Sequence, residues 1–98
     1  MKAKLIKHEK VTDELGNTIE VKIWSVAKAP DKPHGFKYSL VYIVNGKRVV
    51  GYDNAEGKGD HKHFKQDGVL KEIPYSFKSL NKLVADFLKD MEKIKGEL

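Results

Sequence analysis

Two histidines that flank a lysine, His61-Lys62-His63, are the side chains of this sequence best suited to chemistry. Imidazole gains and loses a proton near neutral pH, which suits it to general acid–base catalysis and to metal binding. Residues two apart point to the same side of an extended chain, so His61 and His63 can act on one substrate or one ion. Two carboxylates, Asp53 and Asp60, precede them along the chain.

The first chemistry that fits is metal-free cleavage of RNA, in which a 2′-hydroxyl attacks its own phosphodiester. His61 and His63 would serve as general acid and base, a role that is worth roughly 10²–10⁴ in rate. Lys58, Lys62 or Arg48 would neutralise the charge that develops on the phosphate.

The carboxylates have a role in either of two interpretations. In the metal-free reaction, Asp53 or Asp60 would fix the tautomer of a histidine by accepting its other N–H. In the alternative, Asp53, Asp60, His61 and His63 bind a divalent ion, and this mixed ligand set admits Zn²⁺ or Mn²⁺. Asn54 joins Arg48 and Lys62 as a candidate for contacting the substrate. The third interpretation of the same residues is an ordinary solvated polar loop.

The composition narrows the choice of function. The chain has no cysteine, so disulfides, thiolate nucleophiles and cysteine-bound zinc are excluded. No apolar run approaches the ~20 residues that span a bilayer, and the charged N-terminus lacks the apolar centre of a signal peptide. We therefore expect a cytoplasmic protein without a membrane partner. The net charge of +5 fits either an ordinary lysine-rich solvated surface or a partner with negative charge, such as RNA or an acidic protein.

Four segments alternate apolar and polar residues with the period of a half-buried strand, namely residues 2–10, 18–27, 36–44 and 47–53. The third is apolar on both faces, which indicates a central strand. Asn45-Gly46 predicts a two-residue type I′ hairpin between the third and the fourth. We expect a long polar loop of roughly 15 residues after Asp53. Residues 73–77 alternate again, but Pro74 restricts them to a sheet edge or to a non-strand conformation.

The C-terminal segment repeats apolar residues at helical spacing from Leu80 to about Lys95, with Ser79 as N-cap and Gly96 at the C′ position. We therefore predict one α+β domain over residues 1–98, a four-stranded antiparallel β-meander with a C-terminal amphipathic helix packed on one face. The opposite sheet face would carry Trp24 and several lysines, and would be free to receive a partner.

Four stretches together resemble a known family: residues 38–43, 46–55, 57–63 and 75–80. The central ones read Gly-Lys-Arg-Val-Val-Gly-Tyr-Asp-Asn-Ala and Gly-Lys-Gly-Asp-His-Lys-His. The pattern is similar to that of the TumE family, small proteins named as the toxin of a two-gene toxin–antitoxin system, and it covers roughly residues 36 to 92. The family pattern often has arginine between the histidines and a further basic residue or histidine after them, where this chain has Lys62 and Phe64. Lysine keeps the charge but lacks the planar fork of arginine.

The resemblance implies a helix-turn-helix antitoxin as partner, and by analogy with other small toxins it favours a ribonuclease that uses RNA as substrate. Three alternatives stay open: a non-catalytic basic module that binds nucleic acid or protein, a metal-dependent nuclease that uses the same loop, and an adaptor whose loop orders against the antitoxin. An exposed strand edge would also allow a homodimer.

Overall fold

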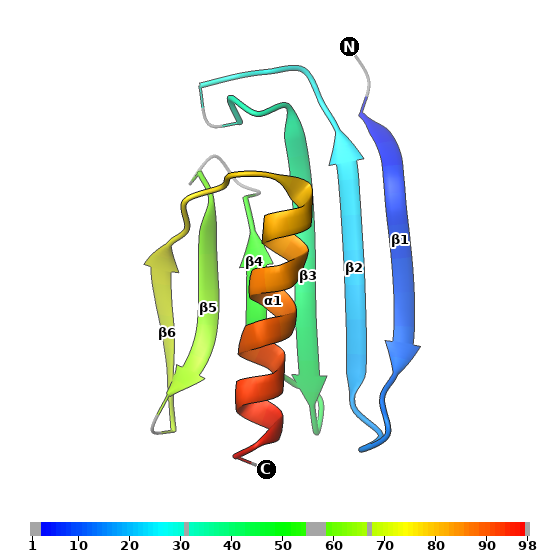
Figure 1. Cartoon of the computed structure of the whole chain (residues 1–98), viewed down its shortest axis with the longest axis vertical. Coiled ribbons are helices and arrows are strands. Elements are labelled where there is room, and N and C mark those ends of the chain that lie inside the picture. Colours follow the sequence, from blue (N-terminus) through cyan, green and yellow to red (C-terminus); the bar gives the residue numbers. More distant parts are fainter. Residues whose placement is uncertain (1–2, 31, 55–58, 67, 98) are drawn as a thin grey trace.

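The computed structural model describes residues 3–30, 32–54, 59–66 and 68–97. The chain forms one antiparallel sheet, with its strands side by side in chain order, and α-helical residues near the C-terminus pack over one face of it (Figure 1). The elements are β1 (Lys4–Thr12), β2 (Thr18–Ser25), β3 (Phe36–Val44), β4 (Lys47–Asp53), β5 (His61–Gln66), β6 (Val69–Pro74) and α1 (Leu80–Lys95). The predicted α+β meander with one C-terminal helix is confirmed, but the sheet has six strands and not four.

The two additional strands, β5 and β6, form a hairpin where the sequence was expected to form a loop. The apolar signal of β5 is weak, because it has a single large apolar side chain, Phe64. β6 has Val69, Leu70 and Ile73 but is exposed along its whole length. A hairpin signal was nevertheless present: Asp67-Gly68 separates Gln66 from Val69, which pair across the two strands.

Two strand boundaries also differ from the prediction. The first strand is shifted by two residues to Lys4–Thr12, and the second ends at Ser25. The hairpin between β3 and β4 is confirmed, since Asn45 and Gly46 both adopt the positive φ that a type I′ turn requires, 52° and 75°. β3 lies inside the sheet, as its two apolar faces predicted.

The core lies between the sheet and one face of α1. Figure 1 shows the helix lying over β3 and β4, roughly along the strands. The buried apolar residues are Val21, Ile23, Tyr38, Leu40, Tyr42, Val49, Val50 and Tyr52 from the sheet and Leu83, Phe87, Met91 and Ile94 from the helix. Every second residue of β2 and β3 therefore faces α1, and so do Val50 and Tyr52 of β4, where a bulge at Val49 places this residue in the core as well. The residues between them face the opposite side, which we call the open face.

The helix begins as predicted, because the Ser79 side chain accepts a hydrogen bond from the backbone N–H of Lys82 at 3.1 Å. It ends at Lys95 with Gly96 as C-cap, but Gly96 keeps a right-handed φ of −65° in place of the left-handed conformation expected at C′. In the described part of the chain, no helix has the length and apolar character needed to cross a membrane.

Tyrosine hydroxyls link the core to aspartates around its rim. The Tyr75 hydroxyl donates to Asp86 of α1 at 2.6 Å, and the Tyr52 hydroxyl donates to Asp90 one helical turn further on. Burial and these hydrogen bonds to carboxylates raise the pKa of both phenols well above the ordinary value. The phenols therefore stay protonated and act as donors that fix α1 against the sheet.

Candidate active site

Asp53, His61 and His63 converge on the open face of the sheet. Asp53 ends β4 and pairs directly with His61 at the start of β5, and His63 pairs with Gly51. Paired residues of antiparallel strands share one face, and residues two apart on a strand share it too. Tyr52 points into the core on the other side, so Asp53 and both histidines must lie away from α1.

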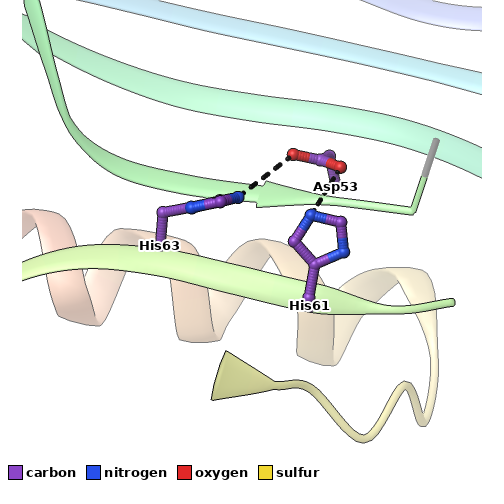
Figure 2. A group of neighbouring side chains, drawn as sticks. All are labelled: Asp53, His61 and His63. Atoms are coloured by element: carbon purple, nitrogen blue, oxygen red, sulfur yellow. Dashed lines mark ion pairs between the residues drawn. The ribbon is translucent and has the colours of Figure 1, made fainter. Parts of the chain in front are cut away.

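The Asp53 carboxylate lies between the two imidazoles (Figure 2). Its Oδ1 is 2.9 Å from His61 Nε2, and its Oδ2 is 3.8 Å from His63 Nε2. The two rings are nearly perpendicular, with their centroids 5.0 Å apart. The side chains of both histidines are largely buried, at 9% and 12% exposure. The pairing of His61 and His63 on one substrate or ion, expected from their spacing, is therefore geometrically available.

Both ring nitrogens of His61 face oxygen acceptors. Nδ1 is 3.0 Å from the carbonyl oxygen of Gly59, which can only accept, so Nδ1 carries a proton. Nε2 faces the Asp53 carboxylate, so it binds either a second proton or a cation shared with Asp53. A hydrogen bond from the remote nitrogen to a backbone carbonyl is also the arrangement by which metal-binding histidines are oriented.

His63 is in a different electrostatic environment. Burial, followed by the positive charge of Arg48, lowers its pKa, and Glu72 acts weakly in the opposite direction. Its two ring nitrogens lie 3.8 Å from Asp53 and 3.9 Å from Glu72, which are both beyond hydrogen-bond distance. His63 is therefore held as a neutral imidazole near neutral pH, with no short bond to a carboxylate.

Arg48 reaches His63 across a glycine. A Cβ built on Gly51 would lie only 2.9 Å from Arg48 Cδ, so the arginine side chain crosses the strand where a larger residue would block it. Arg48 was a sequence candidate for contacting phosphate, and the structure places it on the same face as the histidines. Gly51 was not a candidate, and its part in this arrangement is visible only once the strand register is known.

Glu72 of β6 was also missed by the sequence analysis. It pairs with His63 across the strands, and its carboxylate oxygens lie 3.9 Å from both His61 and His63. A hollow of about 330 Å³ borders the cluster here and is lined by Asp60, His61, Glu72, Ile73 and Pro74. Solvent therefore reaches His61 and Glu72 from the β6 edge of the sheet.

Asp60 is separated from the cluster although it precedes His61. Its carboxylate accepts hydrogen bonds from the Tyr38 hydroxyl at 2.7 Å and from His34 Nε2 at 3.0 Å. His34 also stacks on Phe77, with the ring centroids 3.9 Å apart. Asp60 therefore belongs to a second polar cluster that includes the core residue Tyr38.

Two other candidates point away from the histidines. The Lys62 side chain lies on the helix side of β5, where it pairs with Asp90 at 3.1 Å. Asn54 is completely buried, and its side chain forms hydrogen bonds to the backbone of Tyr38 and Phe36. Lys58 lies outside the described residues. Of the candidates named from the sequence, Asp53, His61, His63 and Arg48 are thus brought together, whereas Asp60, Asn54 and Lys62 are not.

The side chains of Asp53, His61 and His63 could together hold a metal ion. Among the described residues, one ligand atom from each of Asp53, His61 and His63 lies within 4.8 Å of the others. Two imidazole nitrogens and a carboxylate oxygen suit Zn²⁺ or Mn²⁺ better than Mg²⁺, which prefers oxygen ligands alone. Asp60, which was part of the ligand set considered from the sequence, is not in this group.

The protein is thus an α+β domain in which one helix covers one face of a six-stranded meander and a histidine–carboxylate cluster lies on the other face. The chain matches the model of the family described as Toxin TumE over residues 2–95, and it therefore belongs to the TumE family of toxins. No curated protein and no solved structure gave a match to the chain. A toxin family implies an antitoxin as partner.

Proposed function

We propose that this toxin acts by cleaving RNA at the cluster of Asp53, His61 and His63. The observation that carries the proposal is the pair of largely buried imidazoles that share one carboxylate on an open sheet face. Cleavage through the 2′-hydroxyl needs one group to take the proton of that hydroxyl and another to protonate the departing 5′-oxygen. The two imidazoles of the cluster would supply both groups.

The environments of the two rings suggest which histidine is the general base and which is the general acid. His63, whose pKa is lowered, would accept the proton of the 2′-hydroxyl as general base. His61, whose two nitrogens both face acceptors, would carry the proton that is given to the 5′-oxygen, and Asp53 would orient it. Arg48 would stabilise the charge that builds up on the phosphate in the transition state.

The test is cleavage of a single-stranded RNA by the purified toxin and by His61→Ala, His63→Ala and Asp53→Asn. Each substitution should slow cleavage by roughly 10²–10⁴. His8→Ala is the matched control, because His8 also pairs with a carboxylate on the open face, Glu20 at 3.1 Å, but lies on β1. RNA that binds but stays intact with the wild-type protein would refute the proposal and favour the non-catalytic binding module.

A metal-dependent reaction at the same residues is the second candidate. It is favoured by the hydrogen bond between His61 Nδ1 and Gly59, which leaves Nε2 directed at Asp53 for a shared cation. Calorimetric titration with Zn²⁺ and Mn²⁺ should then show one site in the wild type and none in His61→Ala. Cleavage that is lost in EDTA and restored by Mn²⁺ or Zn²⁺ would select this candidate, and cleavage unaffected by EDTA would reject it.

The helix-turn-helix antitoxin and the homodimer are proposals about partners. The first predicts a small helix-turn-helix reading frame next to this gene whose product co-purifies with the toxin. The second predicts a dimeric mass in light scattering. The outer edge of β1 supports it, because β1 is nine residues long and lies at one side of the sheet.

A further inference from the structure

The chain's one tryptophan, Trp24, lies on the open face and not in the core. Its neighbour Ile23 on β2 is buried against α1, so the indole must point to the opposite side. The register places it between Leu5 of β1 and Lys37 of β3. Lys37 Nζ lies 5.3 Å from the centre of the indole ring. Trp24 is thus a half-buried aromatic side chain of the open face, with the Lys37 cation over its ring.

Trp24 is close to the proposed cleavage site. Ser39 pairs with Asp53 on one side and with Lys22 on the other, so these three residues form a row across β4, β3 and β2. Strands are about 4.8 Å apart and residues on one face repeat about every 6.8 Å. Trp24, two residues beyond Lys22, is therefore about 12 Å from Asp53 on the same face.

The positive charges of this face are only partly neutralised. Lys22 lies 3.9 Å from Glu20, which also pairs with His8. Lys37 and Arg48 form no ion pair with any of the described residues. An uncovered surface that combines an aromatic platform with cations is the arrangement by which proteins hold single-stranded nucleic acids.

We infer that the open face binds single-stranded RNA, with a base stacked on Trp24 and the backbone near Lys22 and Lys37 leading to Asp53 and the histidines. This inference rests on the proposed function, because it names the form of the substrate and a binding residue outside the cluster. Charge complementarity fits RNA and an acidic protein segment alike, but the flat ring of Trp24 near the cations favours RNA, because it can stack on any base.

The first experiment uses the fluorescence of Trp24 as a direct reporter. A 2′-O-methyl oligouridine, which lacks the attacking hydroxyl, should quench the emission of the wild-type toxin, and its integrity is checked on a gel. A duplex RNA of the same length should quench far less at equal concentration, because its bases are already stacked. Absence of quenching by the single strand would overturn the inference, and so would equal quenching by the duplex.

Variants distinguish the contribution of base stacking to RNA binding from the contribution of the positive charges. Trp24→Ala should weaken binding of the labelled oligouridine, measured by anisotropy, roughly 5- to 100-fold, and Trp24→Phe should weaken it less. Leu88→Ala, which removes an exposed apolar side chain from α1, is the matched control and should leave binding unchanged. Lys22→Ala combined with Lys37→Ala should reduce the slope of log K against log salt by about 1.4, whereas Lys89→Ala on α1 should not.

Different results would refute RNA binding at Trp24 and RNA cleavage at the histidines. If the wild type cleaves RNA while Trp24→Ala binds and cleaves it equally well, the inference is wrong and the cleavage stands. If the oligouridine quenches Trp24 and every RNA stays intact, the binding face stands and the cleavage is wrong. If the antitoxin changes the emission of Trp24 and RNA does not, this face belongs to the protein partner and the inference is wrong.

Discussion

Asn54, directly after Asp53, should be among the most sensitive positions for stability. Its side chain is fully buried, with Oδ1 accepting from the N–H of Tyr38 at 3.0 Å and Nδ2 donating to the carbonyl of Phe36 at 2.7 Å. Asn54→Ala leaves both backbone groups without these partners. At about 1–3 kcal/mol for each unpaired group, the free energy of unfolding should fall by about 2–6 kcal/mol. For a domain of this size the loss corresponds to a Tm lower by roughly 8–48 °C.

Urea denaturation followed by circular dichroism measures the loss directly. Asn81→Ala makes the same change at an exposed position of α1 and should alter the free energy of unfolding by less than about 0.5 kcal/mol. Asn54→Asp keeps the acceptor for Tyr38 but removes the donor to Phe36 unless the carboxyl is protonated. Its deficit relative to wild type should therefore shrink as the pH falls. A loss below about 1 kcal/mol in Asn54→Ala would refute the reasoning, because a lost pair of buried hydrogen bonds costs more than that.

Three further substitutions test the electrostatics of the site and the start of the helix. Gly51→Ala brings a Cβ to 2.9 Å from Arg48, so the arginine should move away and the pKa of His63 should rise; an unchanged NMR titration of His63 would contradict this. Because the fold lowers the pKa of His63, the unfolded chain binds more protons, so stability should fall as the pH drops below the ordinary pKa of 6.5. His63→Gln should flatten that part of the urea-derived pH profile, and equal slopes in both proteins would refute the assignment. Ser79→Ala removes the N-cap bond to Lys82 and should cost about 1 kcal/mol in thermal unfolding, whereas an unaltered Tm would show that the cap is dispensable.

The parts of the fold that were predictable have strong local signals. Asn45-Gly46 fixes a two-residue turn by its backbone preferences alone, and the apolar spacing after Ser79 fixes the helix and its buried face. In both places, a few neighbouring residues determine the conformation. The pairing of His61 with His63 on one face was predictable for the same reason, since alternation is a property of any extended strand.

The hairpin of β5 and β6 was missed because its stability does not come from its own apolar residues. β5 is held by pairing with β4 and by polar contacts, among them the ion pair of Lys62 with Asp90 on α1. Glu72 and Gly51 could not be assigned to the site for this reason, since their neighbours follow from the register between strands and not from the sequence near them. Asn54 resembled a substrate-binding residue in sequence because its polar type does not reveal that it is buried.

The register of β5 decides whether the histidines lie beside Asp53 at all. A shift of one residue would exchange the two faces of the strand, so that Lys62 would replace the histidines beside Asp53. The start of β5 is held by Asp60, whose backbone carbonyl accepts from the N–H of Tyr75 and whose side chain accepts from Tyr38 and His34. Asp60 is thus not part of the cluster of Asp53, His61 and His63, yet its hydrogen bonds hold the chain in place directly before His61. The hydrogen bonds of Asp60 on the helix side therefore help to position the histidines on the open face.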